Sequence, residues 1–597
     1  MPRSGSPGPL MERLEAVSDM VLRRTRIPGG QPALLLGLLL SGCNDEKLDG
    51  PAPATSVAVG QPGTPHLPPE LAPKPNAATP APAAPEAPVA LSVFPKQPEH
   101  AGPWFVVTSP AAGVYSEPSF ERRAKLGWVR AGGRLPLKGK PVSTKNCTGG
   151  WYELVGGGYT CGNYGTTNLA HPDVKFAQNQ PKLEDVLPYP YARNAKNGTP
   201  LYKTVPSREQ MLRYEPYLEK KKDEAVAENG EGAEKSAEKP PAVAAEAAAG
   251  DAVTRPASIG AIAALAGAAI DPTLTEPGLE AEAAAPETPW WQQENIKDRL
   301  HEVTLSHLEA DADDLLAKRM VQGFYVAVDR TFRWNDRTWY KTTKGLVTPS
   351  ERFWQTAGPT FKGVELDGTT LKLPMAWGYG GRKQVASYKI DPETQKLENA
   401  KSYERRAPLV LTGKKVEIAK TEYVETSEGT WVKSAHVRIT EPGAPPAGLA
   451  SDERWIEVDL SSQTLIAYVG TRPVYATMIS SGKQSKIKEK DHRTPTGEFR
   501  VREEHITTTM DGDGSAAGDL PYSIEDVPYV MYYHKAYALH GAFWHSNFGT
   551  QMSHGCVNLA PLDAKYLFFF ANPDFRAGFH GMWSRPENAG ARIVIHD

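Results

Sequence analysis

Short runs that alternate apolar and polar residues are clearest in residues 452–597. "RWIEVDL" and "TLIAYVG" flank a Ser461-Ser462-Gln463 turn, and this period of two predicts the paired strands of a β-hairpin. "PVYATMISSGK" predicts a further strand. "TPTGEFRV" predicts a turn followed by a strand, with Gly497 able to take a positive φ angle.

Further along, "VPYVMYYHKAYALHG" predicts two strands, the second of which ends at His540. The glycine expected in a tight turn near Lys535 is missing. The acidic "MDGDGSAAGDL" is expected to be a mobile loop and not a calcium site, since no glutamate closes it as in an EF-hand. Residues 503–526 are therefore expected to form loops beside the site.

A helical pattern follows in "APLDAKYLFFFA", residues 560–571. Pro561 suits the first turn of a helix, and Leu562, Tyr566 and Phe569 or Phe570 would share one face. Ala560 stands where a capping side chain would otherwise be expected. This part of the chain therefore predicts a β-rich domain with one short helix.

Shorter β patterns occupy much of the chain before it. Residues 104–170 read as a small antiparallel β domain that resembles bacterial SH3-like modules, in "GVYS" and "WYEL". Residues 171–220 form a connecting region. Within the β-rich region 296–441, residues 296–320 are expected to be helical, and residues 322–349 and 407–439 to form strands, in one or two SH3-like units.

Composition separates these domains. At 597 residues the chain is too long for one core. Residues 44–103 are rich in Pro and Ala, and residues 221–295 in Ala, Glu and Pro, so we expect a disordered tether and a disordered linker. A net charge of −3 and the lack of a basic stripe argue against nucleic-acid binding.

The N-terminus predicts export. Arginines precede the apolar "PALLLGLLLSGC", which is too short to span a bilayer and reads as a signal sequence. Its ending at Cys43 resembles the bacterial lipobox, which implies that residues 1–43 hold the signal peptide and that Cys43 is lipidated. An ordinary secretory signal is the alternative. The expected location is periplasmic, with a lipid anchor in a bacterial membrane.

The other three cysteines differ in context. Cys147 and Cys161 lie in one glycine-rich segment with strand-like character and, in an oxidising compartment, are expected to form a disulfide. Cys556 then has no partner, and an unpaired thiol in an exported protein is an oxidation liability. It stands in "ALHGAFWHSNFGTQMSHGCVNL", which also holds His540, His545 and His554.

Three interpretations of this stretch compete. A zinc site is disfavoured because a single residue separates His554 from Cys556, whereas zinc ligands usually pair at wider spacing. A purely structural role leaves the lone thiol unexplained. The third is a nucleophile, because an imidazole near a thiol favours the reactive thiolate. His540 would be the base, the Gly541 carbonyl would orient it, and nearby backbone N–H groups would bind an oxyanion.

"HG" at His540-Gly541, followed by "SHGCVN" at residues 553–558, resembles the signature of the L,D-transpeptidase catalytic domain. "IEVDLSSQTLIAYVG", "ISSGK" and "TPTGEF" fall in the order this family shows, and the resemblance covers roughly residues 454–597. It implies a mainly β fold with a catalytic β-sandwich at residues 452–597. It also implies a periplasmic cysteine acyltransferase that acts on peptidoglycan stem peptides and needs no cofactor or metal.

By the same resemblance Cys556 attacks a tetrapeptide donor, and the thioester passes to an amine of a second stem. His554 and Gly555 would line the oxyanion side. Ser553 and Asn558 would shape the turn and, with Tyr532, contact substrate. Carbapenems are expected to acylate Cys556. The expected partners are stem peptides, an acceptor lipoprotein as a second candidate, and the membrane through the lipid anchor.

Other functions remain open at this point. A hydrolase on the same scaffold, such as an L,D-carboxypeptidase or an amidase-type enzyme, would use water in place of the acceptor amine. A non-catalytic wall-binding lipoprotein would use its SH3-like modules, but such a protein has no need for both Cys556 and His540.

Overall fold

The computed structural model describes residues 99–219, 288–379, 383–512, 521–572 and 574–597. The expected signal peptide with Cys43, residues 44–98 of the expected tether and residues 221–287 of the expected linker lie outside the described residues. In the described ranges, no helix is long and apolar enough to cross a membrane.

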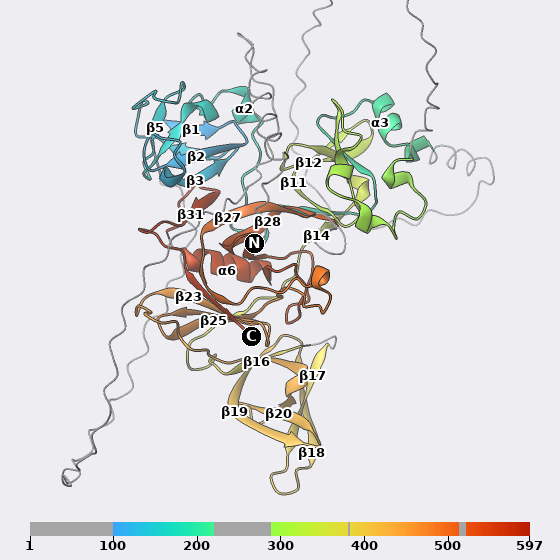
Figure 1. Cartoon of the computed structure of the whole chain (residues 1–597), viewed down its shortest axis with the longest axis vertical. Coiled ribbons are helices and arrows are strands. Elements are labelled where there is room, and N and C mark those ends of the chain that lie inside the picture. Colours follow the sequence, from blue (N-terminus) through green and yellow to red (C-terminus); the bar gives the residue numbers. More distant parts are fainter. Residues whose placement is uncertain (1–98, 220–287, 380–382, 513–520, 573) are drawn as a thin grey trace, which may run out of the picture. The chain divides into compact units, whose positions relative to one another are not determined.

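The first described module is an antiparallel β structure, as its alternating pattern predicts (Figure 1). Strand β1 pairs with β4 and β7, while β2 pairs with β3 and β6, and β6 with β5. Its strands are β1 (Trp104–Val107), β2 (Ala111–Tyr115), β3 (Lys125–Arg130), β4 (Arg134–Pro136), β5 (Trp151–Glu153), β6 (Tyr159–Cys161) and β7 (Gly165–Thr166). Short 3-10 turns cover Arg122–Ala124 and Gly162–Tyr164.

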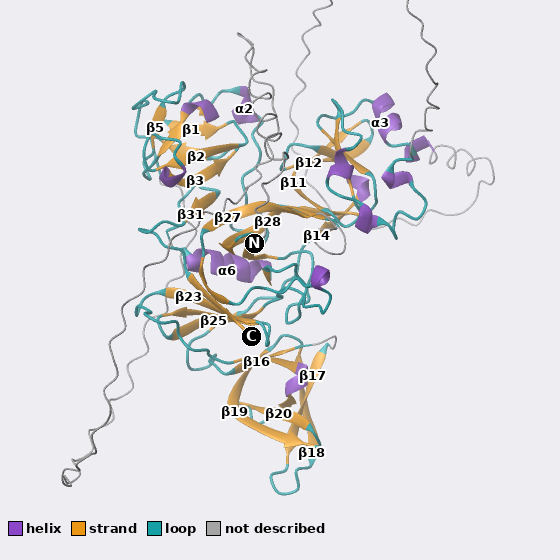
Figure 2. Ribbon diagram, in the orientation of Figure 1, coloured by secondary structure: helices purple, strands orange, loops and turns teal. Residues whose placement is uncertain are grey.

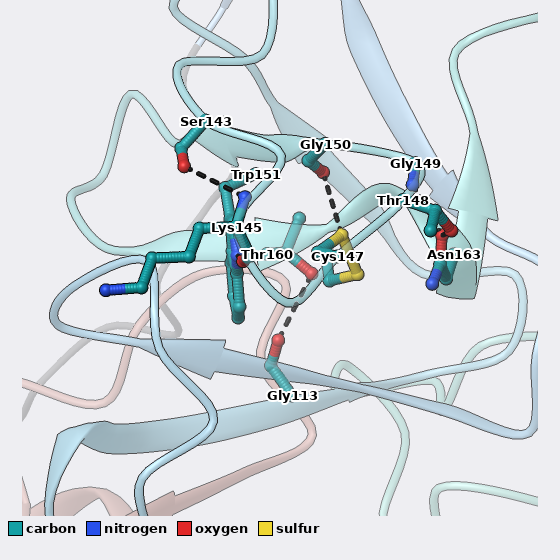
Figure 3. The surroundings of a disulfide bond; sticks show 11 residues. Gly113, Ser143, Lys145, Cys147, Thr148, Gly149, Gly150, Trp151, Thr160 and Asn163 are labelled. Atoms are coloured by element: carbon teal, nitrogen blue, oxygen red, sulfur yellow. Dashed lines mark hydrogen bonds between the residues drawn. A yellow bond between two sulfur atoms is a disulfide. The ribbon is translucent and has the colours of Figure 1, made fainter.

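Cys147 and Cys161, the pair expected to be bonded, form a disulfide in this module (Figure 3). Both sulfurs are buried beside Trp151, whose indole N–H donates to the Lys145 carbonyl at 2.8 Å. The Thr160 hydroxyl, next to Cys161, donates to the carbonyl of Gly113 at 3.1 Å. The bond therefore ties the loop before β5 to strand β6.

A second module combines strands from both sides of residues 220–287. Strand β9 pairs with β10 and β13, and β8 pairs with β11 and β14. Helix α2 (Pro172–Lys175) lies in the connecting segment, beside the first module (Figure 1). The elements of the second module are β8 (Tyr191–Asn194), β9 (Thr199–Tyr202), α3 (Arg208–Tyr214), β10 (Leu316–Met320), β11 (Tyr325–Trp334), β12 (Arg337–Thr342), β13 (Val347–Pro349) and β14 (Phe353–Thr356). Further 3-10 turns cover Trp290–Gln292 and Ser350–Arg352.

The helix expected over residues 296–320 is wrong. The structure has 3-10 turns at Leu300–Glu302 and Ser306–Glu309, followed by strand β10. The Asp313 carboxylate accepts the backbone N–H groups of Leu315 and Leu316, at 2.9 and 2.7 Å. Such side-chain bonds replace the helical bonds of the backbone, and pairing with β9 then makes the extended conformation the stable one.

A third module holds a seven-stranded sheet of order β18-β17-β21-β20-β19-β16-β22. The strands are β16 (Met375–Gly378), β17 (Gln384–Ile390), β18 (Leu397–Glu404), β19 (Pro408–Ile418), β20 (Thr421–Thr426), β21 (Trp431–Lys433) and β22 (Val437–Thr440), with a 3-10 turn at Ser434–His436. Residues 407–439 are thus mostly strand, as their alternation predicts.

The C-terminal domain contains a six-stranded sheet of order β15-β25-β24-β23-β32-β26. Its strands are β15 (Val364–Glu365), β23 (Arg454–Asp459), β24 (Thr464–Val469), β25 (Arg472–Met478), β26 (Gly497–Arg500) and β32 (Arg592–His596), and a 3-10 turn covers Lys488–Lys490. The predicted hairpin is present, with Gln463 at φ +57° in its turn. Gly497 begins β26 at φ +135°, a value that favours glycine.

The opposing sheet is built on the long hairpin of β27 (Glu503–Gly512) and β28 (Tyr522–His534). It continues through β29 (Tyr537–Gly541) and β30 (Val557–Leu559) on one side and β31 (Gly581–Trp583) on the other. The loops expected over residues 503–526 are therefore wrong for most of that range, since only residues 513–520 lie outside the described part. Between β28 and β29, Lys535 takes φ +46° in place of the missing glycine.

Helix α6 (Pro561–Ala571) lies between these two sheets, in contact with β23 on one side and with β28, β29 and β30 on the other (Figure 2). Pro561 occupies its first turn and Ala560 provides no side-chain cap, as expected. The expected shared face is not the most buried one: Leu562 and Tyr566 are only partly buried, whereas Leu567 is fully buried. A helix between two sheets is buried on nearly every side.

Candidate active site

Two parallel strands position the candidate nucleophile. In the β29–β30 pair, His540 lies opposite Asn558 and Leu539 opposite Val557. Residues opposite each other in a parallel pair point to the same side, and successive residues alternate. Cys556, which immediately precedes β30, is therefore on the side of His540 and Asn558, while Val557 points into the core at 0% exposure. The strand register thus places the two residues expected to carry the chemistry on the same side of the sheet.

Ser553 organises the turn before Cys556. Its hydroxyl accepts the N–H of Gly555 at 3.1 Å and donates to the carbonyl of Cys556 at 2.5 Å. This closes a tight loop around the residue that carries the thiol. Ser553 is buried, and its two hydrogen bonds lie within the turn.

Gly555 has a conformation and a packing that only glycine satisfies. Its φ is +116°, and a Cβ atom placed there would lie 2.3 Å from the ring of Tyr537. The Gly555 carbonyl accepts the Thr494 hydroxyl at 2.9 Å, and that hydroxyl oxygen accepts the N–H of Gly482 at 2.9 Å. The turn is therefore held from both its own side and the segment after β25.

This arrangement changes one expectation about the oxyanion side. The N–H of Gly555 donates to Ser553 and is not available to a substrate oxygen. His554, the other residue expected there, is exposed, and its ring stacks on Tyr522 at 5.4 Å between ring centres. The sequence predicts that Gly555 lines the oxyanion side, whereas in the structure its N–H group donates to Ser553 within the turn.

The Cys556 thiol is partly buried and not in a disulfide. Burial raises the pKa of Cys556 to about 11, and the backbone of Ala538 opposes this rise. The sulfur donates to the Ala536 carbonyl at 3.8 Å, and no hydrogen bond to His540 is present in the part of the chain that the structure describes. The group is therefore a neutral thiol at pH 7.

His540 is almost fully buried, and burial lowers its pKa to about 4. The backbone of Gly541 opposes that shift, but Nδ1 makes no hydrogen bond within the described residues, so the orienting role expected of the Gly541 carbonyl stays a prediction. The ring stacks on Trp544 at 5.7 Å. A neutral imidazole of this kind can accept a proton, and catalytic hydrogen bonds are often long until substrate binds.

Tyrosines surround the thiol. The pKa of Tyr522 is raised to about 12 by burial and by the charge that Cys556 carries when ionised. Burial and the charge that Cys556 carries when ionised also raise the pKa values of Tyr532 and Tyr533. Tyr532, expected to contact substrate, is partly exposed and packs on the same apolar cluster as Cys556.

Asn558 has a partner that the sequence did not single out. Its side-chain amide lies 2.9 Å from Nε2 of His545, and its backbone exchanges two 2.9 Å hydrogen bonds with Ser480. Thr494, Ser480 and His545 thus support the site. Only His545 was conspicuous in the sequence, as a third histidine in the same stretch. Among the described residues, no group of three His, Cys, Asp or Glu side chains could hold a metal.

Residues 453–595 match the family model of the L,D-transpeptidase catalytic domain, known as YkuD. This part of the chain is an L,D-transpeptidase catalytic domain. No curated protein matches the chain.

Solved structures of L,D-transpeptidases are also similar to the chain. An Enterococcus faecium L,D-transpeptidase mutant is 22% identical over 26% of this chain and 55% of that chain, with a TM-score of 0.19. The chain thus spans about half the length of that enzyme. The catalytic domain from E. faecium is 24% identical over 24% of this chain and 98% of that domain, with a TM-score of 0.19. An L,D-transpeptidase from Mycobacterium smegmatis is 15% identical over 41% of this chain and 90% of that chain, also at 0.19.

Proposed function

We propose that this chain is an L,D-transpeptidase that cross-links peptidoglycan stem peptides through a thioester on Cys556. The observation that carries the proposal is an unpaired thiol at the start of β30, on the same side as His540, within an L,D-transpeptidase catalytic domain. No cofactor is needed for acyl transfer by a thiol and an imidazole.

In the first step, the Cys556 sulfur attacks the carbonyl carbon of the diamino acid in a tetrapeptide donor as its proton moves to the His540 imidazole. The carbon–sulfur bond forms, and the bond to the nitrogen of the terminal D-Ala breaks. That nitrogen takes the proton from His540, and D-Ala leaves. Because both groups start neutral, proton transfer accompanies attack on the bound donor.

In the second step, an amine of another stem attacks the thioester carbonyl; the new amide bond forms, and the carbon–sulfur bond breaks to release Cys556. His540 accepts the amine proton and returns a proton to the sulfur. Water in place of the amine would give a shortened monomer instead. The amine of an acceptor lipoprotein would give a protein attached to peptidoglycan by the same chemistry.

The turn residues receive roles that suit their contacts. Ser553 and Gly555 hold the backbone that precedes the sulfur. With the N–H of Gly555 engaged, we assign oxyanion binding to the backbone N–H of Cys556, beside the reacting sulfur. Asn558 fixes the far side of the turn through His545, and Tyr532 lines the donor site.

We also propose that the protein works outside the cytoplasm, held to a membrane by a lipid on Cys43. The lipobox-like "LSGC" and the Pro/Ala-rich residues 44–103 support this proposal. A lipid anchor concentrates the enzyme near its substrate, and a tether rich in proline extends its reach.

The test is mass spectrometry of purified tetrapeptide muropeptides incubated with the wild-type protein and with Cys556→Ala. We expect a dimer with a 3-3 link and released D-Ala from the wild type, and neither product from Cys556→Ala. His171→Ala, at a partly exposed histidine that precedes α2, serves as the control and should match the wild type. A shortened monomer without dimer would show a hydrolase, and no turnover by folded wild-type protein would refute the proposal.

A further inference from the structure

Asp526 is a buried acidic residue in the middle of strand β28. It is 2% exposed and has φ +49°, a left-handed conformation that is uncommon outside glycine. A carboxylate in such a place needs a paired charge and several hydrogen bonds to remain ionised.

Arg130 of the first module supplies the charge. Its guanidinium donates to both carboxylate oxygens of Asp526, at 2.7 and 3.1 Å, from the end of strand β3. Burial alone would raise the pKa of Asp526, but the Arg130 charge and hydrogen bonds hold it well below the usual range. The pair is therefore an ionised, bidentate contact between the first module and the catalytic domain.

The second module reaches the same carboxylate. The Thr343 hydroxyl, at the end of β12, donates to Asp526, and its carbonyl accepts from Arg130 at 3.0 Å. The Tyr191 hydroxyl, from β8, donates to the Asp526 carbonyl at 2.5 Å. Within the catalytic domain, the Thr507 hydroxyl of β27 donates to the carboxylate at 2.7 Å.

The two preceding residues of β28 are fixed to the second module as well. Ile524 is paired in parallel with Tyr325 of β11, and the Glu525 carboxylate accepts the N–H of Ala327 at 3.2 Å. Residues 524–526 of the β27–β28 hairpin thus contact both the first and the second module, which we call the accessory modules.

Tyr522 stands four residues before Asp526 on the same strand and contacts the active-site turn. Its ring lies parallel to that of His554, 2° from coplanar, and it interacts electrostatically with Cys556. Across the hairpin it is paired with Gly512. Any movement of the hairpin at Asp526 would shift this ring relative to the thiol.

We infer that Asp526 is a positioning residue: by joining both accessory modules to the β27–β28 hairpin, it holds Tyr522 against the turn that carries Cys556. The accessory modules then set the access of molecules to the nucleophile. The inference deepens the proposed function and rests on it for its effect on transfer, but its effect on thiol access stands alone.

A second buried pair offers a matched control. Arg337 of β12 donates to both oxygens of Glu215, at 3.1 and 2.8 Å, wholly within the second module. Glu215→Gln makes the same acid-to-amide change in the same kind of bidentate pair as Asp526→Asn, without touching the hairpin. It reports what the loss of a buried ion pair does to the protein in general.

The experiment measures two quantities for each variant: the rate of Cys556 alkylation by iodoacetamide and the rate of muropeptide transfer. We expect Asp526→Asn to speed alkylation, on the order of threefold to tenfold, and to slow transfer, because the ring no longer shields and orders the site. Tyr191→Phe, which removes one hydroxyl, should show smaller changes in the same directions. Glu215→Gln should change neither, at temperatures well below its melting temperature.

Combining variants shows whether Asp526 acts through Tyr522. In a Tyr522→Ala background, where alkylation is already fast, Asp526→Asn should add no further increase. The inference would be overturned if the effects of Asp526→Asn and Tyr522→Ala on the alkylation rate multiplied in the double variant. Equal effects of Asp526→Asn and Glu215→Gln would also overturn it. If Asp526→Asn does not fold, Tyr191→Phe with and without Tyr522→Ala decides the question. Alkylation needs no substrate, so this outcome is independent of whether the wild type transfers.

Discussion

The two reactive side chains are both neutral at physiological pH. Burial raises the pKa of Cys556 to about 11 and lowers that of His540 to about 4. A preformed thiolate–imidazolium pair would require the opposite shifts. Desolvation by the apolar cluster around the sulfur therefore outweighs any stabilisation of a charged pair, and the thiol stays protonated at neutral pH.

The first prediction concerns the pH dependence of alkylation. With a thiol pKa of about 11, the thiolate fraction of Cys556 rises about tenfold per pH unit across the neutral range. The rate of alkylation by iodoacetamide should therefore keep rising from pH 6 to beyond pH 9, with free cysteine as the reference that levels off near its own pKa of about 8.5. A plateau below pH 8 would show that an ion pair exists after all.

Individual residues differ in how far sequence reveals them. Cys556 and His540 are identified by their spacing and their glycine neighbours, because a reactive thiol needs a base and a tight turn. Asp526 is not, since its role comes from contacts with residues hundreds of positions away, such as Arg130. Tyr522 is not either, since its contact with His554 arises only in the fold. Nothing in the sequence around Asp526, which follows another acidic residue, indicates that its carboxylate is buried.

Among the elements, strand β27 and the end of helix α6 meet at a buried carboxyl group. Glu504 of β27 is 1% exposed and accepts the Asn572 side-chain amide at 2.5 Å, while its Oε1 has no partner within the described residues. Burial raises the pKa of Glu504 to about 8. The folded protein therefore holds the protonated acid at this joint at neutral pH.

A pH-dependent stability follows from this joint. Between the unfolded pKa near 4.5 and the folded value of about 8, the folded state binds a proton that the unfolded state has lost, so stability falls as pH rises. We expect the melting temperature to drop by about 5 °C or more between pH 5 and pH 8. The Glu504→Gln variant should show a flatter profile, measured by scanning calorimetry.

The deciding comparison is between the slopes of melting temperature against pH, and not between the melting temperatures themselves. Glu503→Gln, at the neighbouring and partly exposed residue whose pKa is lowered by a hydrogen bond from His505, should keep the slope of the wild type. Parallel slopes for Glu504→Gln and the wild type would mean that Glu504 is not the titrating group.

Local patterning predicts elements well where burial alternates along a strand, as in the β23–β24 hairpin. It fails over residues 296–320, where the helical spacing of apolar residues competes with Asp313 and with pairing to β9. It also mistakes strand β27 and the first residues of β28, up to Asp526, for loops, because threonines and acidic residues there face other modules and not solvent. Where another module buries a strand residue, the strand's own sequence need not alternate apolar and polar positions.

Taken as a whole, the described chain shares core and sheets between modules. Buried residues of the first module, such as Phe105 and Val129, belong to the same apolar cluster as Val458 and Ile593 of the catalytic domain. Strand β3 pairs with β31, and β11 with β28. The first and second modules are therefore structural parts of the same folded unit as the C-terminal domain.

Truncation tests this view. Residues 452–597 alone would expose the edges that pair with β3 and β11 and would leave Asp526 without Arg130. Unpaired edges promote aggregation, and a broken ion pair of this kind costs about 3 kcal/mol or more. We expect a lower melting temperature and more aggregation than for residues 99–597, by calorimetry and light scattering. Equal melting temperatures would show that the domain is self-sufficient.

The chain order of the Asp526 contacts has a consequence for biosynthesis. Arg130 and Thr343 precede Asp526 by 396 and 183 residues, and chains are made from the N-terminus onward. The binding partners of the hairpin are thus translated before the hairpin itself, and the thiol comes after both. A polypeptide whose translation stops before residue 556 lacks the Cys556 thiol, so under the proposed function abortive products would be inactive.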